Sequence, residues 1–348
     1  MRAIELLVRF RSLLVFLLVF ACGLSFPQTY PVKEVDSLLK AGINCIIIQN
    51  YSKANVIFTK LDHEYPSIPL GKIYLAATSI AKSYDYAEEY DAYLIMNNLS
   101  IAKDMSEKLM DTANANIWYH YFDALAIGYR AYYNALNENW VTAFSSGLSS
   151  VNEFNNCLDI DKNFYDALIA TGSYKYWRSR KTEYFNWLPF VSDERDLGIS
   201  YLEHAIAKTS YNTYLAELSL IWIFIDKGLY AEAVKIGERS VQNAPEARIF
   251  KWALARAYED VDTLKAVDTY QQILKSYGDI NKTNHVNEVV LKHKIAQLYY
   301  RMGKYNESLN YCNEILSLKK LNKYASERLK SRLEKVKSLA DAIKEHSK

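Results

Sequence analysis

Apolar side chains recur every three or four residues along most of the sequence, which is the spacing of one face of an α-helix. The clearest case lies near the end of the chain, in the stripe of Leu329, Leu333, Val336, Ala340 and Ile343. Only 11 Gly and 6 Pro occur in 348 residues, so turn signals are scarce and the elements between them must be long. The pattern therefore predicts an all-α protein.

A short constellation of residues returns in separate parts of the chain with the same internal spacing. Ala54 precedes Pro66 by twelve residues, and Ala233 precedes Pro245 by the same interval. Proline lacks an amide donor and clashes with the preceding helical turn, so both prolines mark the end of a helix. A third copy of the constellation contains Ile295, Ala296, Tyr299, Gly303 and Tyr305. A fourth, weaker copy contains Leu254, Ala255, Tyr258, Ala266 and Tyr270. Such recurrence is typical of repeat proteins.

These residues resemble the tetratricopeptide pattern of 34 residues, in which Leu-Gly-x2-Tyr is followed by Ala-x3-Phe and then by Pro. Ala54 and Phe58 fit the middle of this pattern, as do Ala266 and Tyr270, although no unit has its first Trp. The resemblance implies an α-solenoid of about seven antiparallel helix pairs with a C-terminal capping helix. It also implies a concave surface, lined by the first helix of each pair, that binds a peptide segment or a helix.

The strength of the pattern divides the chain into four segments. Residues 1–23 form a leader, and residues 31–110 carry N-terminal repeats. Residues 111–208 are degenerate, aromatic-rich helical repeats, with an insertion near 181–193 where Trp187-Leu188-Pro189-Phe190 interrupts the helical periodicity. Residues 209–345 carry the C-terminal repeats and the capping helix.

The leader has the parts of an export signal. Three Arg residues precede an apolar run from Leu13 to Ala21, and small residues follow it. A membrane-spanning helix needs about 20 apolar residues and is the less favoured interpretation. Two other interpretations of the leader stay open. The first is a signal peptide that is cleaved off. The second is a lipoprotein leader, because Val19-Phe20-Ala21-Cys22 resembles the bacterial lipoprotein box, in which an acylated Cys22 would tether the protein to a membrane. Both predict an exported bacterial protein, periplasmic or associated with the outer membrane.

Charge and motifs narrow the function. The formal net charge is +2, so no global field recruits nucleic acid. No catalytic or phosphate-binding motif has the required spacing, and we predict no enzymatic activity, no cofactor and no metal site. His285 and His293 are interpreted as solvated histidines. Cys45, Cys157 and Cys312 are interpreted as small buried hydrophobes, because no metal-ligand spacing joins them.

The expected function is that of a scaffold or adaptor of the cell envelope or periplasm, which binds a protein or peptide partner in the concave groove. Aromatic and Arg side chains are the usual binding hot spots. In the tetratricopeptide frame, the first helices place such side chains on the groove at Trp222, Trp252, Arg256, Tyr300 and Arg301. For the two Trp residues, packing between helix pairs is the competing interpretation.

Two other features suggest ligands of a different kind. In the aromatic segment, Trp177 and Trp187 lie near the cations Arg178 and Arg180 in the sequence. Stacking on the rings and cation–π attraction predict an alternative glycan- or lipid-binding site there. The competing interpretation is that these bulky side chains only fill space at irregular helix crossings.

From Lys319 onward, the sequence has ten Lys or Arg residues and four Asp or Glu residues. This excess suits an acidic partner or an anionic membrane surface, whereas the interleaved acids favour a solvated helix face.

Overall fold

The computed structural model describes residues 29–113, 116–183, 192–208, 211–278, 284–318 and 321–346. These ranges contain 15 helices and no strand. They form seven consecutive pairs followed by a last helix, so the prediction of an all-α solenoid with a capping helix is confirmed. The pairs are α2 (Lys33–Ile47) with α3 (Tyr51–Glu64), α4 (Leu70–Tyr86) with α5 (Ala92–Ala113), α6 (Ile117–Leu136) with α7 (Trp140–Ile160), α8 (Tyr165–Lys181) with α9 (Arg195–Lys208), α10 (Thr213–Asp226) with α11 (Tyr230–Asn243), α12 (Arg248–Tyr258) with α13 (Thr263–Tyr277), and α15 (Val286–Arg301) with α16 (Tyr305–Leu316); the last helix is α17 (Lys323–His346).

The small and aromatic residues of the repeated pattern are the contact points within each pair. Gly42 in α2 lies directly over the ring of Phe58 in α3, and a Cβ at this Gly would lie 2.3 Å from the ring atom Cζ. The Phe58 ring is fully buried and stacks on Tyr74 of α4, with centroids 5.0 Å apart. Close approach of two helices therefore depends on a missing side chain opposite a large one. The fold is tetratricopeptide-like in this respect.

Helix ends follow the sequence signals. α3 ends at Glu64 and α11 at Asn243, each two residues before a proline, as predicted for Pro66 and Pro245. Side-chain caps mark several helix starts; for example, Asn50 accepts from the amide of Lys53 at 3.2 Å, and Asp262 accepts in the same way at the start of α13. Such caps satisfy amides that have no partner inside the helix.

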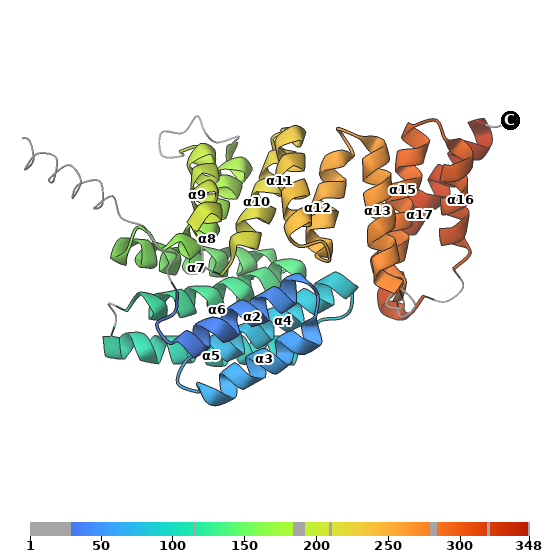
Figure 1. Ribbon diagram of the computed structural model, residues 1–348. Coiled ribbons are helices and arrows are strands. Elements are labelled where there is room, and N and C mark those ends of the chain that lie inside the picture. The colour runs from blue at the N-terminus through green and yellow to red at the C-terminus, as the bar shows by residue number, and fades with distance from the viewer. Residues whose placement is uncertain are drawn as a thin grey trace, which may run out of the picture.

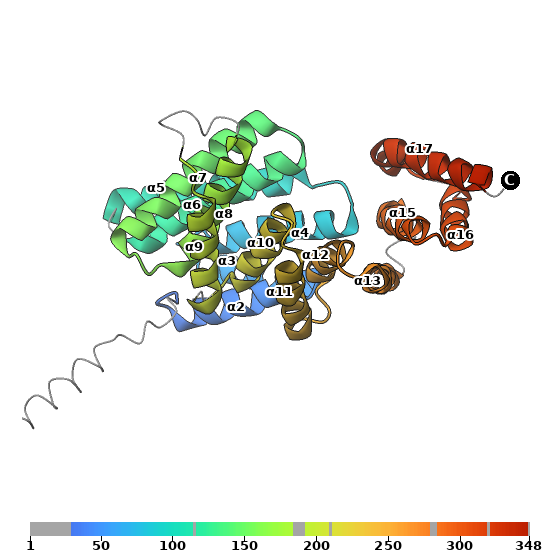
Figure 2. The same cartoon turned by 90° about the horizontal axis from the view of Figure 1, so that it is seen from above.

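The solenoid is folded back on itself. In Figure 1 the first three pairs, α2 to α7, run across the lower ends of the upright helices α8 to α12, and the helices from α13 onward stand to the right of this bundle. Figure 2, from above, shows α10 and α12 over this N-terminal bundle, whereas α15, α16 and α17 extend beyond it. The repeat pattern predicts the pairs but not this arrangement, in which helices far apart in the sequence meet.

Asp85, in the last turn of α4, is the centre of the junction between the two parts. Arg248, the first residue of α12, donates from Nε to Asp85 Oδ1 at 2.9 Å, and its Nη2 pairs with the other carboxylate oxygen. The hydroxyl groups of Tyr51 and Tyr277 also bind this carboxylate, at 3.1 and 3.2 Å. Only 9% and 10% of the Arg and Asp side chains are exposed. The pair is therefore buried but well supplied with hydrogen bonds, as such pairs require.

The carbonyl groups that end α4 are bound by side chains of the C-terminal part. The last carbonyls of a helix have no partner within it. Here Asn287 Nδ2 donates to the carbonyl of Asp85 at 2.7 Å, and Asn284 Nδ2 donates to those of Tyr86 and Ala87, each at 3.1 Å. Residues about 200 positions away thus cap the helix, which couples the two parts through the backbone.

A second contact lies at the start of α10. The hydroxyl group of Tyr211 donates to Asp36 Oδ1 in α2 at 2.6 Å and accepts from the amide of Tyr30 at 2.7 Å. Its neighbour Asn212 donates to the hydroxyl group of Tyr121 in α6 at 3.1 Å. Helices α10 and α12 therefore both begin against the N-terminal bundle.

Two further expectations concern the cysteines and the leader. Cys45, Cys157 and Cys312 are buried and unpaired, as predicted. The leader with Cys22 lies outside the described residues, as does Trp187 with most of the expected insertion. Among the described helices, none has both the length and the apolar character that crossing a bilayer requires.

Candidate binding surface

A hollow of about 470 Å³ lies on the surface between the end of α12, the helix α15 and the capping helix α17. Its volume is within the range of ligand sites, roughly 300–1,000 Å³. Helix α15 supplies most of the wall, α17 the opposite side and the turn after α12 one end. The charged and aromatic side chains that line it are Glu259, His293, Lys294, Tyr300, Arg301 and Lys335.

Two of the five predicted partner-binding residues line this hollow, and a third, Arg256, lies beside its lining residue Glu259. Tyr300 and Arg301 line it, and Arg301 Nη2 donates to the backbone carbonyl of Glu259. Arg256, near the end of α12, forms an ion pair with Asp260 at 2.6 Å and lies 3.8 Å from the Glu259 carboxylate. The tetratricopeptide frame thus places residues from two repeats in one site.

The two predicted Trp residues differ from each other. Trp252 is half-buried in the core, where its ring packs edge-on against Tyr270 at 5.8 Å and its Nε1 donates to Tyr277 at 3.3 Å. Its position matches packing within a helix pair. Trp222 on α10 is 40% exposed, and it remains open for a partner.

His293 corrects the expectation of a solvated histidine. Its side chain, in the middle of α15, is only 2% exposed, and its Nδ1 lies 3.3 Å from Arg332 Nη1 of α17. Burial, and after it the positive charges of Arg332, Lys294 and Lys335, lower the pKa of His293 to about 4. The imidazole is therefore neutral at pH 7. The interpretation of His293 as solvated was wrong, because this residue lies on the buried face of α15. His285 lies on the surface of the turn before α15 and contacts Glu288 at 2.7 Å.

Glu259 is the carboxylate that lines the hollow, and it is already engaged. Lys294 Nζ lies 2.9 Å from its Oε1, and the hydroxyl group of Tyr270 donates to the same oxygen at 2.5 Å. Its side chain is largely buried. The hollow therefore presents more positive than negative charge to a ligand. Among the described residues, no group of His, Cys, Asp and Glu is arranged to hold a metal ion.

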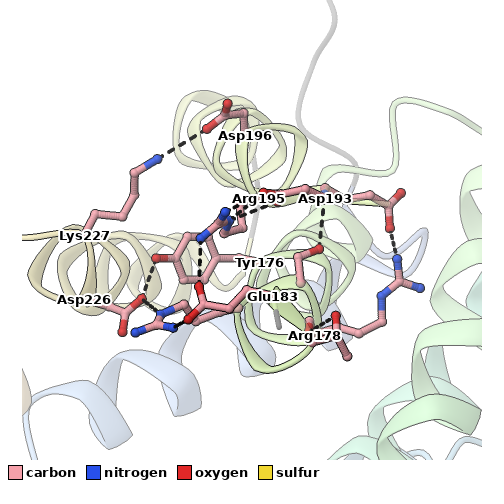
Figure 3. A network of polar contacts seen from close by, with 12 residues as sticks. Tyr176, Arg178, Glu183, Asp193, Arg195, Asp196, Asp226 and Lys227 are labelled. Carbon is pink, nitrogen blue, oxygen red and sulfur yellow. Dashed lines mark hydrogen bonds and ion pairs between the residues drawn. The ribbon is translucent and has the colours of Figure 1, made fainter. Parts of the chain in front are cut away.

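The two cations of the alternative ligand site, Arg178 and Arg180, belong to a polar network between α8, α9 and α10 (Figure 3), whereas Trp187 lies outside the described residues. Arg178 pairs with Glu194 in the segment before α9. Arg180 Nε donates to Asp226, the last residue of α10, at 2.9 Å, and the hydroxyl group of Tyr176 binds the same carboxylate at 2.7 Å. The predicted cations thus have carboxylate partners within the fold. Their role as ligand-binding groups stays a prediction.

A ring contact of Trp177 and two ion pairs near the start of α9 lie next to this network. The ring of Trp177 packs edge-on against Tyr176, with centroids 5.1 Å apart. At the start of α9, Arg195 Nη1 lies 3.3 Å from Glu183, and Asp196 pairs with Lys227 at the same distance. The network therefore ties the ends of three helices together.

An exposed apolar stripe on α7 is a feature that the sequence analysis did not single out. It consists of Trp140, Val141, Phe144 and Leu148, and the Trp and Phe side chains are each 66% exposed. Their spacing of one, three and four residues is that of one helix face, a signal visible in the sequence. A contiguous exposed apolar patch commonly marks a contact site.

Comparison with known proteins gives similarities of fold. No protein-family model matches the sequence, and no curated protein matches it. Among solved structures, PilW, a widely conserved type IV pilus biogenesis factor, is 17% identical with a TM-score of 0.45, over 68% of this chain and 93% of PilW. A tetratricopeptide repeat protein from Parabacteroides merdae is 12% identical with a TM-score of 0.38, over 90% of this chain and 99% of its own. A thermophilic protein of the same repeat class from Thermus thermophilus is 14% identical with a TM-score of 0.39, over 64% of this chain and 98% of its own.

Proposed function

We propose that this chain is a non-enzymatic interaction scaffold that binds a peptide segment or a subunit on the surface formed by α12, α15 and α17. The observation that carries the proposal is the hollow lined by Tyr300 and Arg301, with Arg256 beside its lining residue Glu259. Arg and Tyr are favoured at binding hot spots because they combine apolar area with hydrogen-bonding groups. Repeat proteins of this architecture bind through such surfaces, so the site suits a protein partner.

Site-specific photo-crosslinking in the native host tests this proposal. We expect a chain with p-benzoylphenylalanine in place of Tyr300 to form a discrete adduct with one partner upon irradiation. The matched control carries the same group in place of Tyr93, an aromatic residue on α5 that is 82% exposed and does not line the hollow. Identical adducts from both positions, or no adduct from position 300, would contradict the proposal.

Charge reversal provides a second, independent readout. Arg256→Glu and Arg301→Glu should abolish the adduct, because both guanidinium groups lie at the same end of the hollow. Helical content by circular dichroism should stay unchanged, since both side chains are at the surface. Loss of the adduct together with loss of helicity would report unfolding, and an undiminished adduct would place the partner elsewhere.

We propose that the protein acts in the bacterial cell envelope or periplasm. The leader supports export, because three Arg residues precede an apolar run that ends in small residues. The intact mass of the mature chain from a membrane fraction tests this proposal. An acylated Cys22 at the N-terminus would make the protein a membrane-tethered lipoprotein, whereas a start at Leu24 or Phe26 would make it a periplasmic protein without a lipid anchor. A mature chain that retains Met1 would contradict export.

The alternative function, binding of a glycan or lipid through central aromatic residues, is favoured by the exposure of Trp140 and Phe144. Exposed rings are the groups that stack on sugars or enter a lipid interface. A glycan and lipid array probed with wild type and with Trp140→Ala tests it. Retention of a hit by the variant would exclude this stripe, and absence of hits for the wild type would exclude the function.

A further inference from the structure

We infer that the hollow between α12, α15 and α17 recognises an acidic segment of a protein partner, whose carboxylates meet Arg301 and Lys335 in the hollow and Arg332 beside it. The inference rests on the proposed function, since it specifies the chemistry of the partner that the same surface binds. It is carried by the distribution of paired and unpaired charges around the hollow and by the apolar side chains between them.

The cations on the α17 side of the hollow lack acidic partners. Within the described part of the chain, no carboxylate lies within ion-pair distance of Arg332 or Lys335, and Arg301 meets a backbone carbonyl rather than a carboxylate. By contrast, Lys294 is neutralised by Glu259. Arg301 and Lys335 line the hollow, and Arg332 lies next to it, with its Nη1 3.3 Å from Nδ1 of the lining residue His293. These three positive groups are therefore left for a ligand.

Acidic residues elsewhere on α17 do not compensate this charge. Glu327, Glu334 and Asp341 alternate with the cations along the helix, which suggested ion pairs within it. Among the described residues, however, no ion pair joins one side chain of α17 to another. Arg328, for example, donates to the hydroxyl group of Tyr324 at 2.9 Å. The basic face of α17 is thus available to an acidic partner.

Partial burial makes the unpaired charge more effective. Desolvation lowers the pKa of the Arg332 guanidinium, since part of this cation is removed from water without a carboxylate in exchange. An anionic group bound next to it would offset that loss of hydration. Burial is the main cause of the lowered pKa of His293, and the positive charges of Arg332, Lys294 and Lys335 lower it further.

The lining of the hollow fits a peptide better than a continuous polyanion. Leu298, Leu339 and the ring of Tyr300 contribute apolar surface between the cations. At the α12 end, Asp260 and Glu259 add negative charge beside Arg256, which would repel closely spaced phosphates. An acidic segment with apolar side chains between its carboxylates matches both features.

Binding of such a segment has a consequence inside the protein. Carboxylates near Arg332 and Lys335 would weaken the positive potential at His293 and raise its pKa towards the ordinary value of about 6.5. The His293 ring is therefore a reporter of anion binding that can be followed by NMR titration, independently of any measurement on the ligand.

The test uses the full mature chain and labelled peptides of equal length, with alternating Glu and Leu, Gln and Leu, or Lys and Leu. We expect fluorescence anisotropy to show binding of the Glu peptide at least about tenfold tighter than of the other two, weakening as salt is raised. Saturating Glu peptide should raise the pKa of His293. A single-stranded oligonucleotide that binds more tightly than the Glu peptide, or equal binding of Glu and Gln peptides, would overturn the inference.

Matched variants on one helix separate the site from general charge. Lys335→Glu, in the hollow, should weaken binding of the Glu peptide about tenfold, whereas Lys337→Glu changes the net charge equally on a different face of α17 and should have little effect. Equal losses in both variants would show non-specific attraction and contradict the inference. If neither Lys335→Glu nor added salt reduces the yield of the adduct formed at position 300, the acidic chemistry is refuted while the scaffold function stands. If no partner crosslinks at position 300 although the Glu peptide binds, the scaffold function alone is refuted.

Discussion

At the scale of single residues, Asp123 on α6 is a charged group that the fold holds in an unfavourable environment. Its side chain is 4% exposed, and its Oδ1 has no hydrogen-bond partner among the described residues. Burial, assisted by the nearby carboxylates of Glu153 and Glu107, raises the pKa of Asp123 to about 6. The folded protein therefore binds a proton at this site more tightly than the unfolded chain does.

This makes stability depend on pH in a defined direction. A carboxyl group with a raised pKa stabilises the fold below the unfolded value of about 4, and the contribution is lost as the pH rises through about 6. We expect Asp123→Asn, which mimics the protonated form, to raise the free energy of unfolding by about 2 kcal/mol at pH 7.5 and to have little effect at pH 4. Urea denaturation at both pH values measures this, with the exposed Asp104→Asn as the control. A destabilised variant at pH 7.5 would contradict it.

His293 depends on pH in the opposite direction. Because its folded pKa is lowered to about 4, its contribution to stability is present above pH 6.5 and is lost as the pH falls towards 4. Desolvation is the largest cause, and Arg332 is the next. We expect Arg332→Gln to raise the pKa of His293 while leaving it below 6.5, as measured by NMR titration. Lys330→Gln, elsewhere on α17, should leave the pKa unchanged, and the same value in wild type and Arg332→Gln would refute the electrostatic cause.

At the scale of helices, two glycines show how the surroundings decide the effect of one methyl group. In Gly42→Ala the new Cβ would lie 2.3 Å from the ring of Phe58, which is buried and cannot move away. We expect this substitution to lower the free energy of unfolding by about 1–3 kcal/mol through overpacking. At Gly147, in α7, a Cβ would have no atom within 4 Å, so Gly147→Ala should raise stability by about 0.5–1 kcal/mol through helix propensity. Thermal denaturation of the two variants should show shifts of opposite sign; shifts of the same sign would contradict this account.

The sequence could predict those features of the helices that depend on neighbouring residues. Pro66 and Pro245 fix helix ends, and Ala54 with Phe58 marks the contact within a pair, because each effect acts over a few residues. The pattern also predicts an outward position for Arg301 on α15, and this side chain lines the hollow. It cannot show whether a ring such as Trp252 faces the groove or the core, because that depends on the helix packed against it.

At the scale of the whole molecule, the arrangement of the two parts rests on contacts that no periodicity encodes. Asp85 and Arg248 are separated by 163 positions, and Asp36 and Tyr211 by 175. Neither pair belongs to the repeated constellation. A solenoid pattern specifies contacts between neighbouring pairs, whereas the two parts meet through polar side chains at helix ends and through apolar residues such as Tyr211 and Ala87, which pack in shared core clusters.

Because Asp85 and Arg248 hold the two parts together, we expect the junction to lose stability separately from the repeats. Asp85→Ala leaves the buried Arg248 without its carboxylate and removes the acceptor of two Tyr hydroxyl groups, so we expect a loss of about 3–5 kcal/mol. Hydrogen exchange should accelerate first at the end of α4 and the start of α12, while the amides of α16, on the far side of the capping region, keep their protection. Lys60→Ala breaks an exposed pair with Glu64 and should change stability by less than about 1 kcal/mol. If exchange instead rose evenly over every helix, the two parts would unfold as one unit, and the junction would be no weaker than the repeats that it joins.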